Sequence, residues 1–382
     1  MPLQSGPAVQ NEIYLAGGAE WPLSPEEWEE RARSALPVEA FDYVAGGAGS
    51  EQTIRANRDA FVRHTLRPRM LVGTAERDLT VDLLGLRLPV PFLLAPVGVL
   101  SIVHPDADLA LARASVATGV PFVLSGAAST SIEDVAAAAG NTGRWFQLYW
   151  FNDHELAASL VQRAEAAGYS AIVLTVDTLA LGWRDRDLRH GYLPFLGGNG
   201  LAHCFSDPVF RSRLERTPEE DVRAASLSAL QLFSNLALTW ADLEWLRAQT
   251  SLPILIKGVL TAEDGRLAAD HGAAGVVVSN HGGRQVDGSI ATLDALGGVR
   301  EAVGNDFTVL LDGGVRRGPD VLKALALGAD AVLLGRPFVY GLAVGGQRGI
   351  EAVVRQLAGE LDMTMALSGV RSARDVPRSL VG

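Results

Sequence analysis

The chain has 382 residues, of which 48% are hydrophobic, and its sequence pI is about 5.2. This composition is typical of a globular protein with a large core, and the net charge of −11 argues against a surface that binds nucleic acid or anionic membrane lipids. The single cysteine, Cys204, excludes an internal disulfide and a metal site built from several cysteines, so we expect no metal and a cytoplasmic location.

Residues 1–90 are predicted to form an N-terminal extension that packs on the rest of the chain. The first 21 residues lack the basic region and the continuous apolar core of a signal peptide. Residues 24–47 have the pattern of one or two helices, with Ser24 as the first N-cap. The apolar residues 88–103 are too few, and too interrupted by proline, to cross a membrane.

Short apolar runs alternate with Ala- and Leu-rich helical segments through the rest of the chain. The runs lie at residues 91–96, 121–125, 144–149, 171–177, 253–258, 275–280, 308–314 and 331–337. Strands that are apolar throughout belong to a parallel sheet covered on both faces, and eight of them predict a (β/α)8 TIM barrel over residues 91–382. The alternative, an open doubly wound sheet, favours a Gly-rich dinucleotide turn after the first strand, which this sequence lacks.

The connection between the fourth and fifth runs, residues 183–238, is much longer than the others. It contains "WRDRDLRHGYLPFLGGNG" and then a helical pattern. A long segment of this kind in a compact barrel is usually a lid or a binding loop. We therefore predict a lid loop after strand 4.

Polar residues and glycines follow most of the predicted strands. In a (β/α)8 barrel the carboxyl ends of all strands converge on one face, which carries the active site. The strand ends therefore supply the candidate site residues. In chain order these are Pro96, Val97, Gly98, Ser125, Gln147, Tyr149, Thr175, Asp177, Lys257, Ser279, Asn280, His281, Asp312, Gly313, Gly314, Gly335 and Arg336.

The last two strands indicate a phosphate-binding site. The segments "LDGGVRRG" and "LLGRP" place glycine backbones together with Arg316 and Arg336 at neighbouring strand ends. Barrels often bind phosphate at this place through backbone N–H groups and a helix N-terminus. The alternative is that Asp-Gly-Gly only makes a tight turn.

Lysine is rare in this chain: it occurs only at Lys257 and Lys323 among 33 basic residues. Lys257 ends an otherwise apolar strand, where a buried ammonium group needs an anion. We expect this anion to be a phosphate-carrying cofactor. The alternative is a lysine whose charged end reaches solvent at the barrel mouth.

His281 and Asp177 end different strands on the same face and could meet there. A carboxylate beside an imidazole orients the ring and favours its protonated form, which suits a general base. Arg284 and Arg184 follow these two strands, and guanidinium groups suit a substrate carboxylate. The alternatives are a structural loop histidine and arginines in surface ion pairs.

The motifs "SNHGGRQ", "LDGGVRRG", "FQLY", "LTVDT" and "KALALGA" together resemble those of the FMN-dependent 2-hydroxy acid oxidising enzymes. The resemblance implies FMN as the cofactor and His281 as the base, with Asp177 as its partner. It also implies that Arg184 and Arg284 hold the substrate carboxylate. Tyr43 and Tyr149 would be hydroxyl partners of the substrate, and Lys257 would lie near flavin N1. The residues that would hold FMN are Pro96, Val97, Gly98, Ser125, Gln147, Thr175, Ser279, Asp312, Gly313, Gly314, Arg316, Gly335 and Arg336.

Within that family the pattern is most similar to the lactate 2-monooxygenase type. Gly98 stands where many members have alanine beside flavin N5, which implies room for a keto acid to stay in the site and be decarboxylated by peroxide. The alternative for Gly98 is a tight turn. Ala127 stands where several members have tryptophan or tyrosine, which implies a wider pocket and a bulkier substrate.

We therefore predict oxidation of an L-2-hydroxy acid such as lactate, with O2 as the acceptor and possible decarboxylation in the site. One alternative is a simple oxidase that releases H2O2 and takes an aryl or long-chain substrate. Alternatives of other classes are a phosphate-binding isomerase or aldolase that uses Lys257 as a Schiff base, and a binding protein without turnover. The resemblance also implies a homo-oligomer of four or eight chains, and we expect no nucleic-acid or membrane partner.

Overall fold

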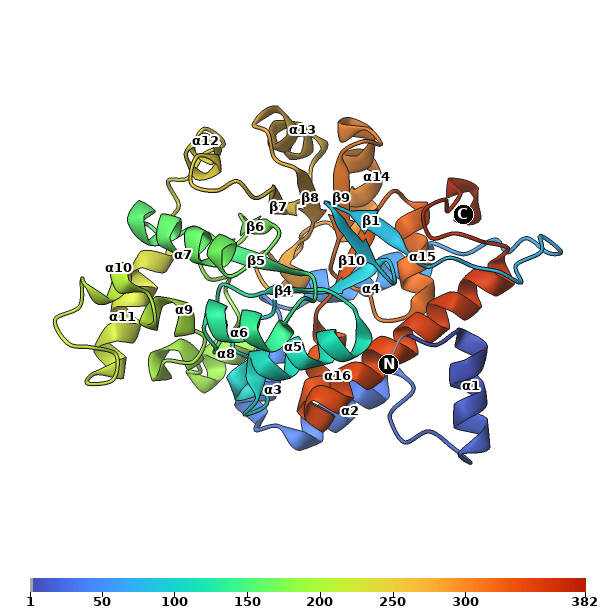
Figure 1. Cartoon of the computed structure of the whole chain (residues 1–382), viewed down its shortest axis with the longest axis horizontal. Coiled ribbons are helices and arrows are strands. Elements are labelled where there is room, and N and C mark those ends of the chain that lie inside the picture. Colours follow the sequence, from blue (N-terminus) through green and yellow to red (C-terminus); the bar gives the residue numbers. More distant parts are fainter. Residues whose placement is uncertain (1–2) are drawn as a thin grey trace.

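The computed structural model of this chain describes residues 3–382 and contains a closed barrel of parallel strands (Figure 1). The first two residues of the predicted extension lie outside the described residues. Within residues 3–382, eight parallel strands follow one another around the barrel in chain order, and the last pairs with the first. They are β3 (Phe92–Leu94), β4 (Phe122–Leu124), β5 (Arg144–Tyr149), β6 (Ile172–Thr175), β7 (Ile254–Val259), β8 (Gly275–Val278), β9 (Thr308–Leu311) and β10 (Ala331–Leu334). The predicted (β/α)8 barrel is confirmed, and the open doubly wound sheet is wrong.

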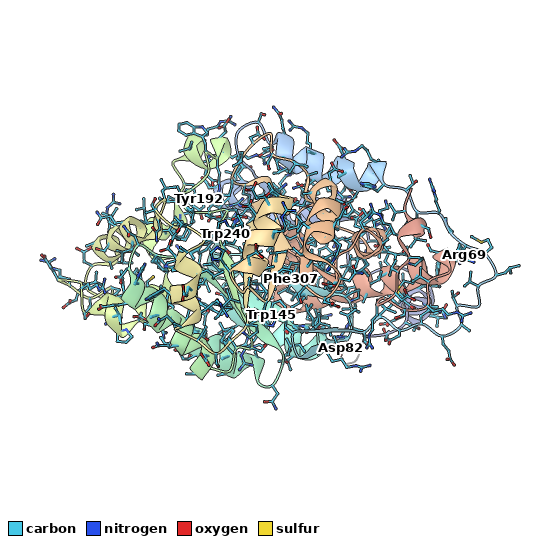
Figure 2. The ribbon with its side chains drawn as sticks, turned by 90° about the horizontal axis from the view of Figure 1, so that it is seen from above. Arg69, Asp82, Trp145, Tyr192, Trp240 and Phe307 are labelled. Carbon is cyan, nitrogen blue, oxygen red and sulfur yellow. The ribbon has the colours of Figure 1, made fainter. Side chains whose placement is uncertain are left out.

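The barrel strands are buried on both faces. Every residue of β6, β8 and β10 is buried, as expected for apolar runs that lie between the barrel interior and an outer layer of helices. Trp145 on β5 is fully buried and lies near the middle of the molecule in Figure 2. Because both faces are apolar, most of the predicted polar site residues lie at or just after the carboxyl ends of the strands, where the chain leaves the barrel wall.

Helices follow the barrel strands, as the Ala- and Leu-rich segments predict. They are α5 (Ala107–Thr118), α6 (Ile132–Ala139), α7 (His154–Ala166), α12 (Asp242–Arg247), α13 (Ala262–Asp270), α14 (Thr292–Val303), α15 (Gly318–Ala326) and α16 (Arg336–Ser368). Ser131, Asp153 and Thr261 are N-caps whose side chains accept a hydrogen bond from the first turn of α6, α7 and α13. The long helix α16 is broken at Gly345 and Gly346, where the backbone leaves the helical conformation.

The N-terminal extension contains helices α1 (Gly6–Leu15), α2 (Pro25–Ala35), α3 (Val38–Ala45) and α4 (Gln52–Arg63), then a hairpin of β1 (Val81–Leu83) and β2 (Leu86–Leu88). Ser24 caps α2 as predicted, in a reciprocal capping box with Glu27. Helices α1 and α2 pack along α16, as the blue and red ribbons of Figure 1 show. Helix α1, helix α4 and the hairpin were not predicted, since strands of three residues leave little pattern in a sequence.

The long connection after β6 is mostly helical. It contains α8 (Asp185–His190), the 3-10 turn η2 (Pro194–Gly197), α9 (Ala202–Phe205), α10 (Pro208–Arg211) and α11 (Val222–Phe233), and the last two lie at the left of Figure 1. Phe210 and Ala225 are buried against neighbouring elements, so this segment is a packed layer rather than a free loop. Within residues 3–382, no helix is long and apolar enough to cross a membrane.

Candidate active site

A cavity of about 1070 Å³, open to solvent at its mouth, lies at the carboxyl ends of the barrel strands. Most of the predicted site residues line it: Tyr43, Pro96, Val97, Gly98, Tyr149, Arg184, Lys257, His281, Arg284, Asp312, Gly313, Gly314, Arg316, Gly335 and Arg336. The other predicted residues do not line the cavity: Ser125, Gln147, Thr175, Ser279 and Asn280 are buried, and Asp177 is partly buried. The expected convergence of strand ends therefore occurs, and Tyr43 is contributed by α3 of the N-terminal extension.

His281 and Asp177 form a hydrogen-bonded pair in the wall of this cavity. The imidazole Nδ1–H donates to Asp177 Oδ1 over 2.8 Å, and this contact assigns the proton to Nδ1. Thr178 Oγ1 donates to the same oxygen over 2.7 Å and lies 3.0 Å from Nδ1. The other ring nitrogen, Nε2, is therefore the one that can accept a proton from a molecule in the cavity. Thr178 was not predicted, although it directly follows Asp177 in "LTVDT".

The loop after β8 turns sharply to present this histidine. His281, Gly282 and Gly283 all have positive φ angles, at 57°, 62° and 80°. For a non-glycine residue, this left-handed backbone conformation raises the free energy by roughly 1–2 kcal/mol, whereas the two glycines adopt it freely. Ser279 Oγ accepts a hydrogen bond from the His281 backbone N–H over 3.0 Å and so fixes the turn.

Lys257 lies between two carboxylates. Its Nζ is 3.2 Å from Asp312 Oδ2 and 3.8 Å from Asp177 Oδ2, and it donates to Ser279 Oγ over 2.9 Å. Burial alone would lower the pKa of Lys257, but Asp312 and Asp177 outweigh it and raise the pKa to about 12. The expected anion was a cofactor, whereas the structure places two carboxylates of the chain itself beside the ammonium group.

The pKa of His281 is lowered from its ordinary value. Burial is the largest cause, and the Lys257 ammonium adds to it, while Asp177 acts in the opposite direction. The sequence predicted that Asp177 would favour the protonated ring. That prediction considered only the nearby carboxylate, and burial outweighs it. His281 is therefore a neutral base near pH 7, while the pKa of Asp177 is held well below its usual range by His281 and Lys257 against the effect of burial.

Arg284 and Arg184 form a cationic end of the cavity. Arg284 Nη1 donates to the backbone oxygens of Tyr43 and Gly46, and the guanidinium carbon lies 5.0 Å from the Tyr43 ring centre. Burial and then Arg184 lower the pKa of Arg284 to about 9. Arg184 has a carboxylate, Asp187, at 3.8 Å, but within residues 3–382 no carboxylate forms an ion pair with Arg284. An anionic ligand would supply the missing charge.

Several buried polar atoms of the predicted cofactor site lack a partner within residues 3–382. They are Gln147 Nε2, Thr175 Oγ1 and Asp312 Oδ1. Gln147 Oε1 is already used, because it accepts hydrogen bonds from Gly126 N and Ser125 Oγ. Unpaired buried donors and acceptors are costly, so these atoms fit a polar ligand such as the isoalloxazine and ribityl of FMN. Ser279 Oγ accepts hydrogen bonds from Lys257 and from the His281 backbone, and its own O–H stays available as a donor.

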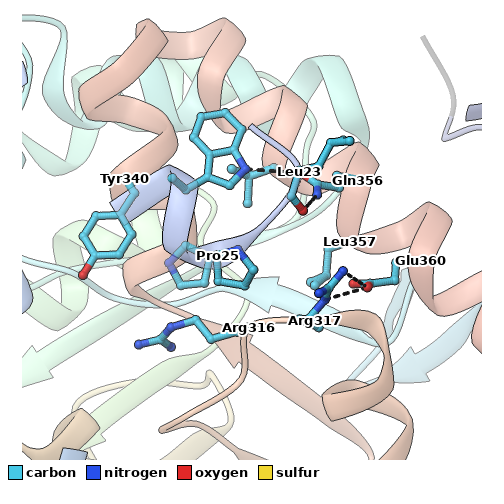
Figure 3. A pocket seen from close by; sticks show the side chains of 11 residues that line it. Leu23, Pro25, Arg316, Arg317, Tyr340, Gln356, Leu357 and Glu360 are labelled. Carbon is cyan, nitrogen blue, oxygen red and sulfur yellow. Dashed lines mark hydrogen bonds and ion pairs between the residues drawn. The ribbon is translucent and has the colours of Figure 1, made fainter. Parts of the chain in front are cut away.

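The phosphate end of the cavity lies between Arg316 and the N-terminus of α16. Gly335 is the N-cap of α16, so free backbone N–H groups and the positive end of the helix dipole lie there. Arg316 is partly buried, and its side chain forms no ion pair within residues 3–382; loss of solvent, followed by Arg336, lowers its pKa to about 10. In Figure 3 its guanidinium points away from the neighbouring ion pair of Arg317 and Glu360. These groups fit a phosphate.

Arg336 lines the cavity and also makes contacts within the chain. Its guanidinium donates to three backbone oxygens, those of Val44 at 3.1 Å, Gly46 at 2.8 Å and Gly282 at 2.9 Å. It thus joins the end of α3 to the loop that carries His281. Some N–H donors of Arg336 remain for a ligand, and more remain on Arg316, which donates only to the Val315 carbonyl within residues 3–382.

Replacing Lys257 by methionine should lower the free energy of unfolding by about 3–5 kcal/mol, because two buried carboxylates would lose their counter-charge. Lys323→Met is the matched control. Lys323 Nζ donates to the Phe61 carbonyl and has a neutral partner, so its loss should cost only about 1 kcal/mol. Urea unfolding of both variants measures the difference. Equal losses in the two variants would contradict this account of Lys257.

This protein has unpaired buried polar atoms next to a site that fits a phosphate. This combination is typical of barrel enzymes that hold a phosphorylated cofactor. The family model described as FMN-dependent dehydrogenase matches residues 32–382, and the chain therefore belongs to this family and uses FMN. L-lactate oxidase of Lysinibacillus sphaericus (strain C3-41) is 43% identical over 358 residues, which cover 94% of this chain and 92% of that protein. Glycolate oxidase 3 of Arabidopsis thaliana is 44% identical over 354 residues, with coverage of 92% and 94%.

The solved structures that are similar to this chain include an oxidase of the same kind of substrate. The crystal structure of mandelate oxidase with (S)-4-hydroxymandelic acid has a TM-score of 0.83 and 39% sequence identity, and the match covers 94% of this chain and 98% of that one. The chain is thus an enzyme of FMN-dependent 2-hydroxy acid oxidation. This membership argues against the isomerase, aldolase and binding-protein alternatives. The raised pKa of Lys257 also argues against a Schiff base, which needs a neutral amine.

Proposed function

We propose that this enzyme oxidises an L-2-hydroxy acid to the 2-keto acid and transfers the two electrons to dioxygen, which gives H2O2. The observation that carries the proposal is the hydrogen-bonded pair of His281 and Asp177 at the cavity that also contains the Arg284 guanidinium, which has no carboxylate partner within residues 3–382. FMN, when bound, supplies the redox chemistry, because it accepts the electrons from the substrate and passes them to dioxygen. The names of the relatives, which include L-lactate oxidase and glycolate oxidase, support the same reaction.

The residues of the chain bind the substrate and accept its proton. Arg284 and Arg184 bind the carboxylate, which places the hydroxyl-bearing carbon before His281 Nε2. His281 takes a proton from the substrate, and Asp177 stabilises the imidazolium that forms. Burial raises the pKa of Tyr149 to about 12, so its hydroxyl stays protonated and donates a hydrogen bond. Tyr43 provides a second hydroxyl at the same end.

The remaining site residues hold the cofactor. Lys257 is a permanent positive charge that would stabilise negative charge near flavin N1. Arg316 and the first turn of α16 would bind the phosphate. The other residues proposed to contact FMN are Pro96, Val97, Gly98, Ser125, Gln147, Thr175, Asp312, Gly313, Gly314, Gly335 and Arg336, while Ser279 would act through Lys257 and His281.

A second outcome, retention and oxidative decarboxylation of the keto acid, rests on Gly98. A Cβ added at Gly98 would lie 2.8 Å from the Cβ of Ala127, closer than such atoms approach in proteins. The glycine therefore makes space for Ala127, and its missing methyl does not by itself leave room for a retained product. This contact favours the simple oxidase over the monooxygenase.

The purified protein should be yellow, and an L-2-hydroxy acid added without oxygen should bleach it. In air, we expect close to one H2O2 per hydroxy acid consumed, measured beside the yield of keto acid. A colourless protein that cannot be reconstituted with FMN would contradict the proposal. Acetate and carbon dioxide from lactate, with little peroxide, would instead favour the monooxygenase.

A further inference from the structure

Thr178 is a buried residue that contacts both members of the His281–Asp177 pair. It is 4% exposed and directly follows Asp177 in the segment after β6. Its Oγ1 lies 2.7 Å from Asp177 Oδ1 and 3.0 Å from His281 Nδ1, and these two atoms are 2.8 Å apart. The three atoms thus form a closed triangle of contacts. An imidazole and a carboxylate form their hydrogen bond without a third group, so the hydroxyl has a separate role.

The chemistry of the three groups places the hydrogen atoms of this triangle. Although burial raises it, the pKa of Asp177 is held well below its usual range by His281 and Lys257, so the carboxylate is ionised and can only accept. The Thr178 hydroxyl and the His281 Nδ1–H therefore both donate to Oδ1. The oxygen of Thr178 then turns a lone pair toward Nδ1–H, which favours the imidazolium form of the ring.

Asp177 lies between two groups that can attract its negative charge. Its Oδ1 is bound to His281, whereas its Oδ2 has no hydrogen-bond partner within residues 3–382 and lies 3.8 Å from Lys257 Nζ. Lys257 is charged near neutral pH, whereas the imidazole is neutral until it takes a proton. Charge alone would draw the carboxylate toward Lys257. The hydrogen bond from Thr178 instead holds Oδ1 at His281.

The backbone around Thr178 is fixed by Gln285, from the loop that carries His281. Gln285 Nε2 donates to the carbonyl oxygens of Asp177 and Ala180, over 2.9 Å in both cases, so it bridges the backbone on either side of Thr178. The last residue of "SNHGGRQ" therefore ties the segment after β6 to the His281 loop. Because this backbone is fixed, the hydroxyl of Thr178 has a defined position.

We propose that Thr178 is a positioning residue that keeps the carboxylate of Asp177 on His281 rather than on Lys257. This inference rests on the proposed function, since it concerns the base of the same reaction. The substrate proton goes to His281 Nε2, and Asp177 Oδ1 stabilises the resulting imidazolium at Nδ1–H. No proton leaves Thr178, whose hydroxyl stays bonded to Oδ1 throughout.

Thr178→Val removes the hydroxyl and keeps the branched shape of this buried side chain. We expect the rate of anaerobic flavin bleaching by an L-2-hydroxy acid to fall roughly tenfold, as for the loss of one hydrogen bond to a charged group. Thr178→Ser keeps a hydroxyl and should recover most of the rate. Thr118→Val is the matched control, since Thr118 is buried and hydrogen-bonded on α5, outside the cavity. Thr178→Ala gives the same comparison if the valine variant does not fold.

Binding without turnover separates positioning of the base from damage to the site. Propanoate lacks the hydroxyl group and cannot be oxidised, and its affinity can be titrated by the change in the flavin spectrum. In Thr178→Val this affinity should stay at the wild-type value, because Arg284 and Arg184 bind the carboxylate. A fall in affinity as large as the fall in the bleaching rate would show that Thr178 only maintains the structure, and would overturn the proposal.

The pH dependence of kcat/KM gives a third readout. In Thr178→Val, Asp177 is free to turn toward Lys257, so the charged form of His281 loses stabilisation while Lys257 and Arg184 still oppose it. The pKa of His281 should therefore fall, and the acid limb should move to lower pH. An acid limb that moves to higher pH would overturn the proposal. The other ionisable groups that line the cavity are the same in this variant: Tyr43, Tyr149, Arg284, Asp312, Arg316 and Arg336.

A double-mutant cycle tests whether Thr178 acts through Asp177. In the Asp177→Asn background no carboxylate remains to be held, so Thr178→Val should slow bleaching much less than it does in the wild type. Equal losses in the two backgrounds, or a Thr178→Ser variant as slow as Thr178→Val, would overturn the proposal. If no 2-hydroxy acid bleaches the wild type, the proposed function itself fails. If the wild type and Thr178→Val bleach equally fast, only the role of Thr178 fails.

Discussion

Replacing His281 by asparagine should lower kcat/KM for 2-hydroxy acids by about 10²–10⁴-fold, while the protein still binds FMN. Asparagine cannot take the substrate proton, but it leaves the ion pairs of Lys257 with Asp312 and Asp177 in place. The rate of anaerobic flavin bleaching in a stopped-flow instrument measures this effect directly. His271→Gln is the control, since His271 follows α13 outside the cavity and should react at the wild-type rate. A His281→Asn variant that bleaches at that rate would remove His281 from the role of base.

The pH dependence of kcat/KM tests the same assignment by another route. His281 must be neutral to act, and its pKa lies below the ordinary value of about 6.5, so kcat/KM should be level at neutral pH and fall only in more acid solution. Asp177 raises the pKa of His281. Asp177→Asn should therefore move the acid limb to lower pH, and it should lower the plateau because the imidazolium loses its counter-charge. An acid limb that moves to higher pH would contradict this account.

The barrel could be predicted from the sequence because its signal is local and repeated. Each strand is a short apolar run, and each polar strand end lies on the same face once the barrel closes. That single geometric rule is enough to predict that Lys257, Asp177 and His281 lie together. Tyr43 was different, since it comes from α3 in the N-terminal extension and only the family resemblance pointed to it.

Features that depend on packing between distant segments could not be predicted. Residues of α11 and η2, from the long connection, line a small cavity together with Ala127, and the periodicity of the sequence does not indicate that contact. The neutral state of His281 depends on burial, and the partners of Ser279 and Arg336 depend on which way each side chain turns. The homo-oligomer of four or eight chains and the cytoplasmic location stay predictions, since a single chain tests neither.

Replacing Arg284 by methionine should lower kcat/KM for 2-hydroxy acids by roughly 30-fold to several thousand-fold. Removing one partner of a buried, hydrogen-bonded charge pair costs about 2–5 kcal/mol, and each 1.4 kcal/mol is a factor of ten. Under the proposed function, the other partner is the substrate carboxylate. Steady-state kinetics in air, with peroxide as the readout, measures the loss. Arg266→Met is the control, because Arg266 is exposed on α13 and far from the cavity lining.

A loss of activity in Arg284→Met has two physical sources, and they can be separated. Arg284 also donates to the backbone oxygens of Tyr43 and Gly46, so its removal loosens the end of α3. Structural damage of that kind would slow an acid and its uncharged amide equally. Loss of the carboxylate contact would slow only the acid, since the amide carries no charge for the guanidinium to bind. We therefore expect the ratio of kcat/KM for acid over amide to fall at least 30-fold in Arg284→Met, and an unchanged ratio would show that Arg284 acts only through the structure.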